Sequence, residues 1–255
     1  MTDDSLLDEM IALALEAGAA TMGVYAGKFD VSVKADASPV TQADEIAEAI
    51  ILKGLAGAAP DIPVLAEESA AAGRIPTLGR RFFLVDPLDG TKEFVSKTGE
   101  FTVNIALIED GAPTMGVVYA PAMGRLYAAS KTAGAFRVDG DGPRKPISAR
   151  KPPAAGLVAV ASRSHRNAET DEFLSKLTIT DFAAAGSSLK FCLVAEGAAD
   201  VYPRLGRTME WDTGAGQAVL EAAGGRVLVH PAGDPLAYGK KARGFDNPHF
   251  IAWGA

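Results

Sequence analysis

The hydrophobic period of this 255-residue chain changes twice along its length, and these changes restrict the fold more than any other feature. Up to residue 55 the apolar residues recur at helical spacing, whereas from residue 63 they gather in short runs that suit buried strands. Beyond residue 157 short apolar runs alternate with helical patterns. Helices, then an antiparallel sheet, then an alternating region together predict a layered protein of mixed α and β structure.

Two amphipathic segments predict helices in the first part of the chain. Residues 6–15 have helical spacing of apolar side chains, and Ser5 stands in the position of a cap. A second helix is expected after Thr41, because Thr41 and Asp44 have the spacing of a capping box. This spacing leaves two roles open for Asp44, as the acid of that box or as a functional group. The segment between the helices predicts strand and turn.

The remaining elements follow from short apolar runs and turn residues. Strands are expected at residues 63–66, 82–85, 102–108, 115–119 and 125–129, then at 157–161, 181–184, 199–202 and 226–229, with helices at 168–177, 188–196 and 213–223. Asp110-Gly111 is a tight hairpin signal. The turn-rich stretch from residue 139 to 153 places a boundary near residue 150, which divides the chain into halves of residues 1–150 and 151–255.

Composition excludes several classes of protein. Lys and Arg total 25 against 32 Asp and Glu, a net charge of -7, whereas a protein that grips nucleic-acid backbone usually has a basic excess. Cys192 is the only cysteine, which excludes an intrachain disulfide and a cysteine-cluster metal site. No apolar run approaches the roughly 20 residues that span a bilayer, and the N-terminus is acidic where a secretory signal would be basic. We expect a cytoplasmic protein.

Acidic residues follow two of the predicted strands. Glu67 and Glu68 come after residues 63–66, and Asp86 and Asp89 come after residues 82–85. Like charges at about 4 Å repel by roughly 4 kcal/mol at an effective dielectric of about 20, so several converging carboxylates need cations between them. Because all the candidate ligands are oxygens, the pattern predicts Mg²⁺ or Mn²⁺. The alternatives are a simple turn for the two aspartates and a solvated charge for Glu68.

Two further segments bear on the same chemistry. Gly90-Thr91 opens a short predicted helix whose backbone N–H groups could hold a phosphate beside the metal. Trp211-Asp212 precedes a predicted helix, so Asp212 could cap that helix and also reach the metal site, with capping alone as the alternative. Carboxylates together with an anion cradle predict phosphoryl chemistry.

Three of these segments resemble the signatures of the lithium-sensitive inositol monophosphatase superfamily, namely Leu-Ala-Glu-Glu-Ser at 65–69, Asp-Pro-Leu-Asp-Gly-Thr at 86–91, and Trp211-Asp212. Longer stretches at 38–44, 89–108, 116–121 and 186–197 resemble the bacterial 3′(2′),5′-bisphosphate nucleotidases of sulfate assimilation. The resemblance covers nearly the whole chain. It implies an αβαβα sandwich whose first half carries most metal ligands, while the second half contributes Asp212 and substrate-binding residues.

The resemblance also implies the reaction, which is Mg²⁺-dependent hydrolysis of adenosine 3′,5′-bisphosphate to AMP and phosphate, with the phosphosulfate accepted by many relatives. Two or three Mg²⁺ ions, which Mn²⁺ can replace, would assist in-line attack by water. The implied metal ligands are Glu67, Asp86, the Leu88 carbonyl, Asp89 and Asp212. The implied catalytic residues are Asp44, Glu67 and Thr91, with Thr91, oriented by Asp44, positioning the water.

For substrate binding the resemblance implies Glu67, Leu88, Asp89, Gly90, Thr91, His165, Gly186, Ser187, Lys190, Arg204 and Asp212. By position alone, Lys190 and Arg204 could equally be surface charges and His165 a loop residue. We expect the second phosphate and the adenosine to lie against these residues of the second half.

Other functions stay open at this point. Another phosphatase of the superfamily, acting on inositol monophosphate or fructose 1,6-bisphosphate, would have the same first-half motifs. A non-catalytic relative that binds phosphorylated metabolites would be expected to lack part of the acid set, and a nuclease would be expected to be basic. The preferred partner is a small nucleotide, with no nucleic-acid polymer and no obligatory membrane. Relatives allow a monomer or a homodimer, and some associate peripherally with the cytoplasmic face of the inner membrane.

Overall fold

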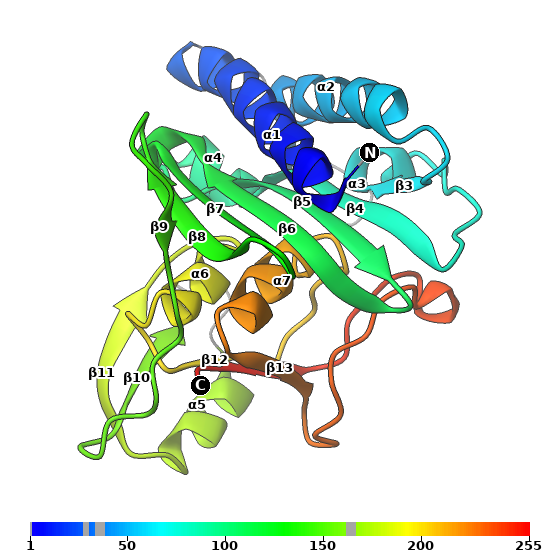
Figure 1. Ribbon diagram of the computed structural model, residues 1–255. Helices are drawn as coiled ribbons and strands as arrows, with labels where there is room; N and C mark the ends of the chain where they lie inside the picture. Colours follow the sequence, from blue (N-terminus) through cyan, green and yellow to red (C-terminus); the bar gives the residue numbers. More distant parts are fainter. Residues whose placement is uncertain (1, 28–30, 34–38, 162–166) are drawn as a thin grey trace.

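Five layers of helix and sheet make up the computed structural model, which describes residues 2–27, 31–33, 39–161 and 167–255 (Figure 1). Helices α1 (Asp3–Ala26) and α2 (Gln42–Ala58) cover the outer face of a seven-stranded sheet. Two more helices, α6 (Leu189–Ala195) and α7 (Gly214–Ala222), lie between that sheet and a five-stranded one. Helix α5 (Ala168–Ser175) packs on the far side of the smaller sheet. The predicted αβαβα sandwich is confirmed.

The larger sheet has the strand order β3-β4-β5-β6-β7-β8-β9. Its strands are β3 (Val64–Ala66), β4 (Arg81–Asp89), β5 (Thr102–Glu109), β6 (Ala112–Ala120), β7 (Arg125–Ser130), β8 (Gly134–Asp139) and β9 (Lys145–Pro146). Only the pair β3 and β4 is parallel; the other neighbours are antiparallel. The predicted hairpin is observed, with Asp110 and Gly111 both at positive φ, as a two-residue turn requires. The short strands β8 and β9 were not predicted, since few of their residues are buried.

The smaller sheet has the order β11-β10-β12-β14-β13. Its strands are β10 (Leu157–Ala161), β11 (Ile179–Ala184), β12 (Val201–Arg204), β13 (Arg226–Val229) and β14 (Phe250–Trp253). Strand β14 was not predicted; it is short and lies between β12 and β13, antiparallel to both. The segment between β9 and β10 separates the two sheets, while the division into halves at residue 150 stays a prediction. A third sheet pairs β1 (Val31–Val33) with β2 (Pro39–Thr41).

The two N-terminal helices begin at side-chain caps. The capping box of α2 is observed, with the Thr41 amide and hydroxyl both 2.8 Å from Asp44 Oδ2. Helix α1 begins earlier than predicted, and its cap is Thr2, whose hydroxyl accepts the Ser5 amide. The prediction of Ser5 as the cap is therefore wrong. The helix also continues to Ala26, because small residues such as Gly18 extend its buried face.

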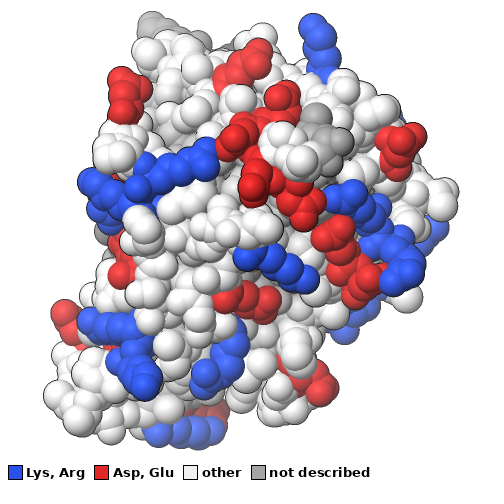
Figure 2. Space-filling view, in the orientation of Figure 1, with Lys and Arg blue, Asp and Glu red and all other residues white. Residues whose placement is uncertain are grey.

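Acidic and basic side chains are interspersed over the face of the molecule shown in Figure 2. No continuous basic stripe crosses this face. Within the described ranges, no helix has the combination of length and apolar character that a membrane span needs.

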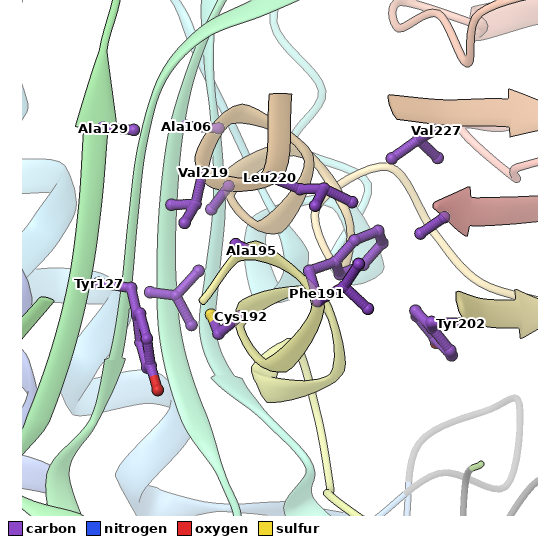
Figure 3. Close-up of a cluster of buried hydrophobic side chains, with 14 of the residues drawn as sticks. Ala106, Tyr127, Ala129, Phe191, Cys192, Ala195, Tyr202, Val219, Leu220 and Val227 are labelled. Atoms are coloured by element: carbon purple, nitrogen blue, oxygen red, sulfur yellow. The ribbon is translucent and has the colours of Figure 1, made fainter. Parts of the chain in front are cut away.

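The central layer joins the two sheets through a shared apolar core (Figure 3). Helices α6 and α7 contribute Phe191, Cys192, Ala195, Val219 and Leu220, the larger sheet Ala106, Tyr127 and Ala129, and the smaller sheet Tyr202 and Val227. The Phe191 ring stacks on Phe250 with centroids 5.7 Å apart and meets Tyr202 edge to face. At Gly116 a Cβ atom would lie 2.5 Å from the Ala215 carbonyl oxygen, so the absence of a side chain lets α7 approach the sheet. This core fixes the two sheets relative to each other.

Truncation of the central ring tests this arrangement. We expect Phe191→Ala to lower the free energy of unfolding by about 3–5 kcal/mol, because it leaves a cavity between the two sheets. Urea denaturation followed by tryptophan fluorescence measures the change. The control is Phe182→Ala on β11, whose ring is 48% exposed and whose loss should cost less than about 1 kcal/mol. Equal losses for the two variants would contradict the role of this core.

Candidate active site

The first two acids of the site come from neighbouring strands: Glu67 follows β3, whereas Asp86 lies within β4 and not after it as predicted. Strands β3 and β4 run parallel with Ala66 opposite Val85, so the next residues, Glu67 and Asp86, follow side by side. Asp86 is only 1% exposed. Burial, followed by repulsion from Glu67, Asp89 and Asp212, raises the pKa of the Asp86 carboxyl well above its usual range. Asp86 is therefore buried, whereas Glu67 beside it is partly exposed.

An irregularity in β4 brings the next acid to the same place. The register with β5 shifts between Asp86 and Asp89, and the Leu88 amide donates to Asp86 Oδ1 at 3.0 Å. Asp89 Oδ2 accepts hydrogen bonds from Ser188 Oγ at 3.0 Å and, more weakly, from Asn104 Nδ2 at 3.4 Å. Burial raises the pKa of Asp89, although Lys190 and Ser188 oppose this shift. The Pro-Leu pair is thus part of a bulge rather than of a plain turn.

The glycine after this acid is required by a contact from the second half of the chain. Gly90 has a φ of 92°, and a Cβ atom there would lie 2.3 Å from Ser187 Oγ. That hydroxyl lies 2.8 Å from the Asp89 carbonyl oxygen and 2.7 Å from that of Glu100. Ser187 therefore fastens the loop just before α4 (Thr91–Val95).

Asp44 caps α2 as its spacing allowed and also faces Thr91, while its catalytic role stays a prediction. Its Oδ2 atom accepts the cap bonds of α2, while Oδ1 lies 3.4 Å from Thr91 Oγ1. The same threonine hydroxyl is 3.4 Å from the Leu88 carbonyl oxygen. A cap bond thus holds the carboxylate that faces Thr91.

Asp212 joins the cluster from the second half. Its Oδ2 atom accepts the Met209 amide at 2.9 Å, and its carbonyl oxygen lies 2.7 Å from Ser188 Oγ, whose single hydroxyl proton has Asp89 Oδ2 as the alternative acceptor. Helix α7 starts at Gly214 without a side-chain cap, so the interpretation of Asp212 as a helix cap is wrong. Burial, then repulsion from Asp89 and Glu67, raises the pKa of the Asp212 carboxyl.

The predicted substrate-binding residues of the second half differ in how deeply they are buried and in what they contact. Lys190 is 6% exposed on α6, so the alternative of a surface charge is wrong, and burial lowers the pKa of its ammonium to about 8 despite the nearby Asp89. Arg204 is half-buried at the end of β12; its Nη2 donates to the Arg207 carbonyl, while its Nε is buried with no partner among the described residues. A Cβ atom on Gly186 would lie 2.5 Å from the Glu100 carbonyl oxygen. His165 lies outside the described residues.

The donor set fits a hard divalent cation in its chemistry. Glu67, Asp86, Asp89 and Asp212 offer carboxylate oxygens, and the Leu88 carbonyl is nearby, all of them ligands that Mg²⁺ prefers. Their mutual effects on pKa place the carboxylates in one electrostatic cluster. Within the part of the chain that the structure describes, no three Asp, Glu, His or Cys side chains form a ready-made metal site, so the agreement with a divalent cation is one of ligand chemistry and not of assembled geometry.

Two supporting residues, Asn104 and Glu48, were absent from the predicted site. Ser188 links Asp89 to the backbone of Asp212, and Asn104 donates to Ser188 at 3.0 Å. Asn104 carried a signal, because it is a polar residue inside the apolar run of residues 102–108. Glu48, whose partners lie in α3 (Glu67–Ala71), gave no such signal, because a glutamate on a helix face is usually a solvated charge.

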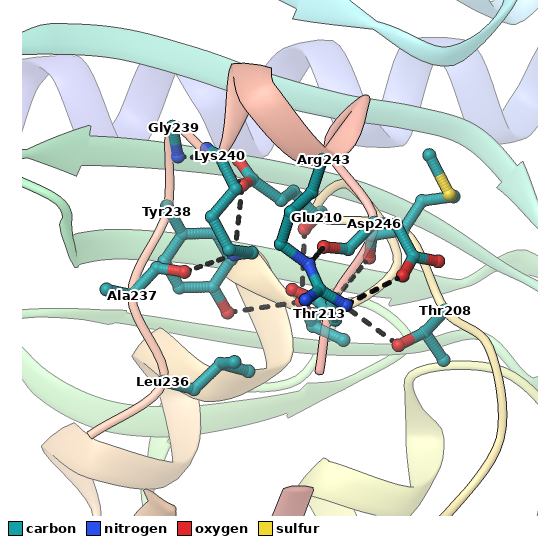
Figure 4. A network of polar contacts seen from close by, with 12 residues as sticks. Thr208, Glu210, Thr213, Leu236, Ala237, Tyr238, Gly239, Lys240, Arg243 and Asp246 are labelled. Carbon is teal, nitrogen blue, oxygen red and sulfur yellow. Dashed lines mark hydrogen bonds and ion pairs between the residues drawn. The ribbon is translucent and has the colours of Figure 1, made fainter. Parts of the chain in front are cut away.

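A loop near the C-terminus holds the segment that carries Asp212 (Figure 4). Glu210 is fully buried and accepts the Gly239 and Lys240 amides at 2.7 Å each, with the Lys240 ammonium 2.9 Å away. Asn247 Nδ2 also donates to the Met209 carbonyl at 2.8 Å. These contacts hold the two residues that closely precede Asp212.

Glu210→Gln should lower the free energy of unfolding by about 1–3 kcal/mol, because an amide leaves one of the buried donors unpaired. Chemical denaturation measures the loss. Glu172→Gln is the matched control, since it also removes a carboxylate partner of a lysine, Lys176, but at an exposed pair where the change should stay within about 1 kcal/mol. A loss for Glu210→Gln no larger than for the control would contradict the bracing role.

The sequence of this chain matches a known protein family. The sequence model of the inositol monophosphatase family matches residues 3–249, and the chain belongs to this family. The chain is 50% identical over 249 residues to the 3′(2′),5′-bisphosphate nucleotidase CysQ of Shigella flexneri, covering 96% of this chain and 98% of that one. CysQ of Escherichia coli K12 is 49% identical with the same coverage.

Solved structures agree with this assignment. CysQ from Bacteroides thetaiotaomicron superposes with a TM-score of 0.84 at 39% identity, covering 98% of this chain and 97% of that chain. An inositol monophosphatase from Anabaena has a TM-score of 0.76 at 29% identity, covering 98% and 90%. The fold is thus that of the inositol monophosphatases, and the CysQ proteins are the more similar of these relatives.

Proposed function

We propose that this chain is a 3′(2′),5′-bisphosphate nucleotidase that hydrolyses adenosine 3′,5′-bisphosphate to AMP and phosphate, and that also accepts the corresponding phosphosulfate. The observation that carries the proposal is the cluster of Glu67, Asp86, Asp89 and Asp212, in which Asp86 is buried and the other three are partly buried, in a chain about half identical to curated nucleotidases. The lower identity to the inositol monophosphatase of known structure favours the nucleotide over inositol phosphate.

The cations of this proposal are two or three Mg²⁺ ions, for which Mn²⁺ can substitute. Glu67, Asp86, the Leu88 carbonyl, Asp89 and Asp212 would hold them. When bound, the ions activate water and neutralise the charge that develops on the phosphoryl group and the leaving oxygen. The chain contributes the carboxylates and holds them close together against their repulsion.

Thr91 and Asp44 would orient the attacking water. With the Thr91 hydroxyl donating to Asp44 Oδ1, its lone pairs point away from the carboxylate and can accept a proton from a water molecule. As that water attacks phosphorus, its proton passes to Thr91 while the threonine proton passes to Asp44. The two cap bonds from Thr41 hold the Asp44 carboxylate in place during this transfer.

Two positively charged side chains of the second half, Lys190 and Arg204, would bind the other phosphate. Lys190 is a buried ammonium that interacts with Asp89, and Arg204 interacts with both Lys190 and Asp212. The unpartnered Nε of Arg204 has a hydrogen bond to give to a ligand oxygen. His165, Gly186 and Ser187 would line the nucleoside on the same side.

The substrate in this proposal is a small soluble molecule and not a nucleic-acid polymer. The net charge of -7 and the mixed charges on the face in Figure 2 both disfavour a polymer track. A cytoplasmic location and a monomeric or homodimeric state complete the proposal.

Phosphate release from adenosine 3′,5′-bisphosphate, inositol 1-phosphate and fructose 1,6-bisphosphate, each at equal concentration with Mg²⁺, tests the substrate. We expect the nucleotide to give the highest kcat/KM and its turnover to fall on addition of lithium. Preference for inositol or fructose phosphate would overturn the substrate and leave the reaction class intact. No turnover of any of the three would support a non-catalytic binding protein.

The metal ligands are tested by Asp89→Asn, which keeps the size of the side chain but removes its charge. We expect kcat to fall by about a thousandfold or more at saturating Mg²⁺, because the cation cluster loses a ligand. Asp110→Asn, in the exposed β5–β6 hairpin, is the matched control and should retain full activity. Near-normal turnover of Asp89→Asn would contradict the assigned role.

A further inference from the structure

A buried glutamate of α2 holds the start of the helix that carries Glu67. The five-residue helix α3 begins at Glu67, and the residue before it, Ala66, provides no side-chain cap. Glu48 takes that place from a different helix: its Oε2 accepts the Glu68 amide at 2.7 Å, and its Oε1 accepts the Ser69 amide at 2.8 Å. The Ser69 hydroxyl adds a third bond, 2.7 Å from Oε1. The first turn of α3 is thus capped in trans by a carboxylate that is 4% exposed.

Both oxygens of Glu48 are used by these donors, so the side chain is engaged with the backbone of α3. Hydrogen bonds from backbone amides to a buried carboxylate are of the strong, charge-assisted kind. The bonded amides belong to the two residues that directly follow Glu67. The position of the Glu67 backbone therefore depends on where Glu48 stands.

Helix α3 borders a cavity on one side. The cavity has a volume of about 860 Å³, and its lining includes Glu48, Glu67, Ser69, Trp211 and Phe245. A helix of five residues has no stability of its own in water and takes its position from tertiary contacts. The three bonds to Glu48 are such contacts, and they lie at the end of the helix that faces the acid cluster.

The face of α2 that carries Glu48 also carries Asp44, which contacts Thr91. Asp44 and Glu48 are four residues apart on α2 and so lie on one face of that helix. Asp44 reaches Thr91, whereas Glu48 reaches the residues after Glu67. One rigid element therefore sets the spacing between the residue that orients water and a carboxylate of the metal site.

We infer that Glu48 is a positioning residue, which acts through the N-terminus of α3 to hold Glu67 in the place where it binds a divalent cation. The inference rests on the ligand set of the proposed function. It assigns Glu48 no contact with the substrate or the reacting atoms. It accounts for a buried carboxylate that the reaction itself does not use.

Mg²⁺ binding to the substrate-free protein, measured by isothermal titration calorimetry, tests the inference without relying on turnover. In Glu48→Gln the side-chain NH₂ group replaces one carboxylate oxygen, and it cannot accept a hydrogen bond from the backbone N–H that it faces. We expect the dissociation constant for Mg²⁺ to rise about 10- to 100-fold, as for other residues that orient metal ligands. In parallel, kcat should recover as the Mg²⁺ concentration is raised, which a loss of folded protein would not produce.

Glu45→Gln is the matched control, because Glu45 is an exposed residue of the same helix, lines the same cavity and has the same charge. It should bind Mg²⁺ as the wild type does. An equal weakening in both variants would show a general charge effect and overturn the inference, as would unchanged Mg²⁺ binding by Glu48→Gln.

Ser69→Ala covers the case in which Glu48→Gln does not fold. It removes one of the three donors and leaves the carboxylate with two partners, so the protein should fold and bind Mg²⁺ about three- to tenfold more weakly. Unchanged binding would overturn the inference. If the wild type itself binds no Mg²⁺, the ligand set of the proposed function is wrong and the role of Glu48 falls with it.

Discussion

Mutual repulsion among four neighbouring carboxylates is the constraint on which the rest of this structure depends. Burial and like charge raise the pKa of Asp86, Asp89 and Asp212, so each of these carboxylates is costly where it stands. The chain offsets part of this cost with donors, namely the Ser188 hydroxyl, the Met209 amide and the buried Lys190 ammonium. A cluster of this kind suits the binding of cations, and it brings together the two halves of the molecule.

Each acid is held by an element that is distant in sequence. Glu48 anchors the turn after Glu67, Ser188 connects Asp89 with Asp212, and the loop around Lys240 and Asn247 braces the segment of Asp212. The apolar layer of α6 and α7 keeps these supports in register, because it packs against both sheets at once. The family fold thus provides rigid placement, while the chemistry comes from a small set of side chains on its loops and strand ends.

Sequence reasoning predicted most of the helices and strands because their signals are local. The capping box at Thr41, the hairpin at Asp110-Gly111 and the apolar runs of the central strands all appear where they were expected. Strands β8 and β9 escaped prediction because few of their residues are buried and their apolar pattern is weak, and β14 because it is only four residues long. The reading of Asp212 as a cap failed because its carboxylate turns back to the Met209 amide.

The sequence by itself determined the layered class, the two acidic segments at neighbouring strand ends and, through resemblance, the family. These depend on periodicity and on short motifs, which are properties of adjacent residues. Only the tertiary structure decided that Lys190 is buried, that Gly90 must make room for Ser187, and that Glu48 caps another helix. Each of these depends on contacts between residues that are far apart in the chain, and periodicity and local spacing carry no record of such contacts.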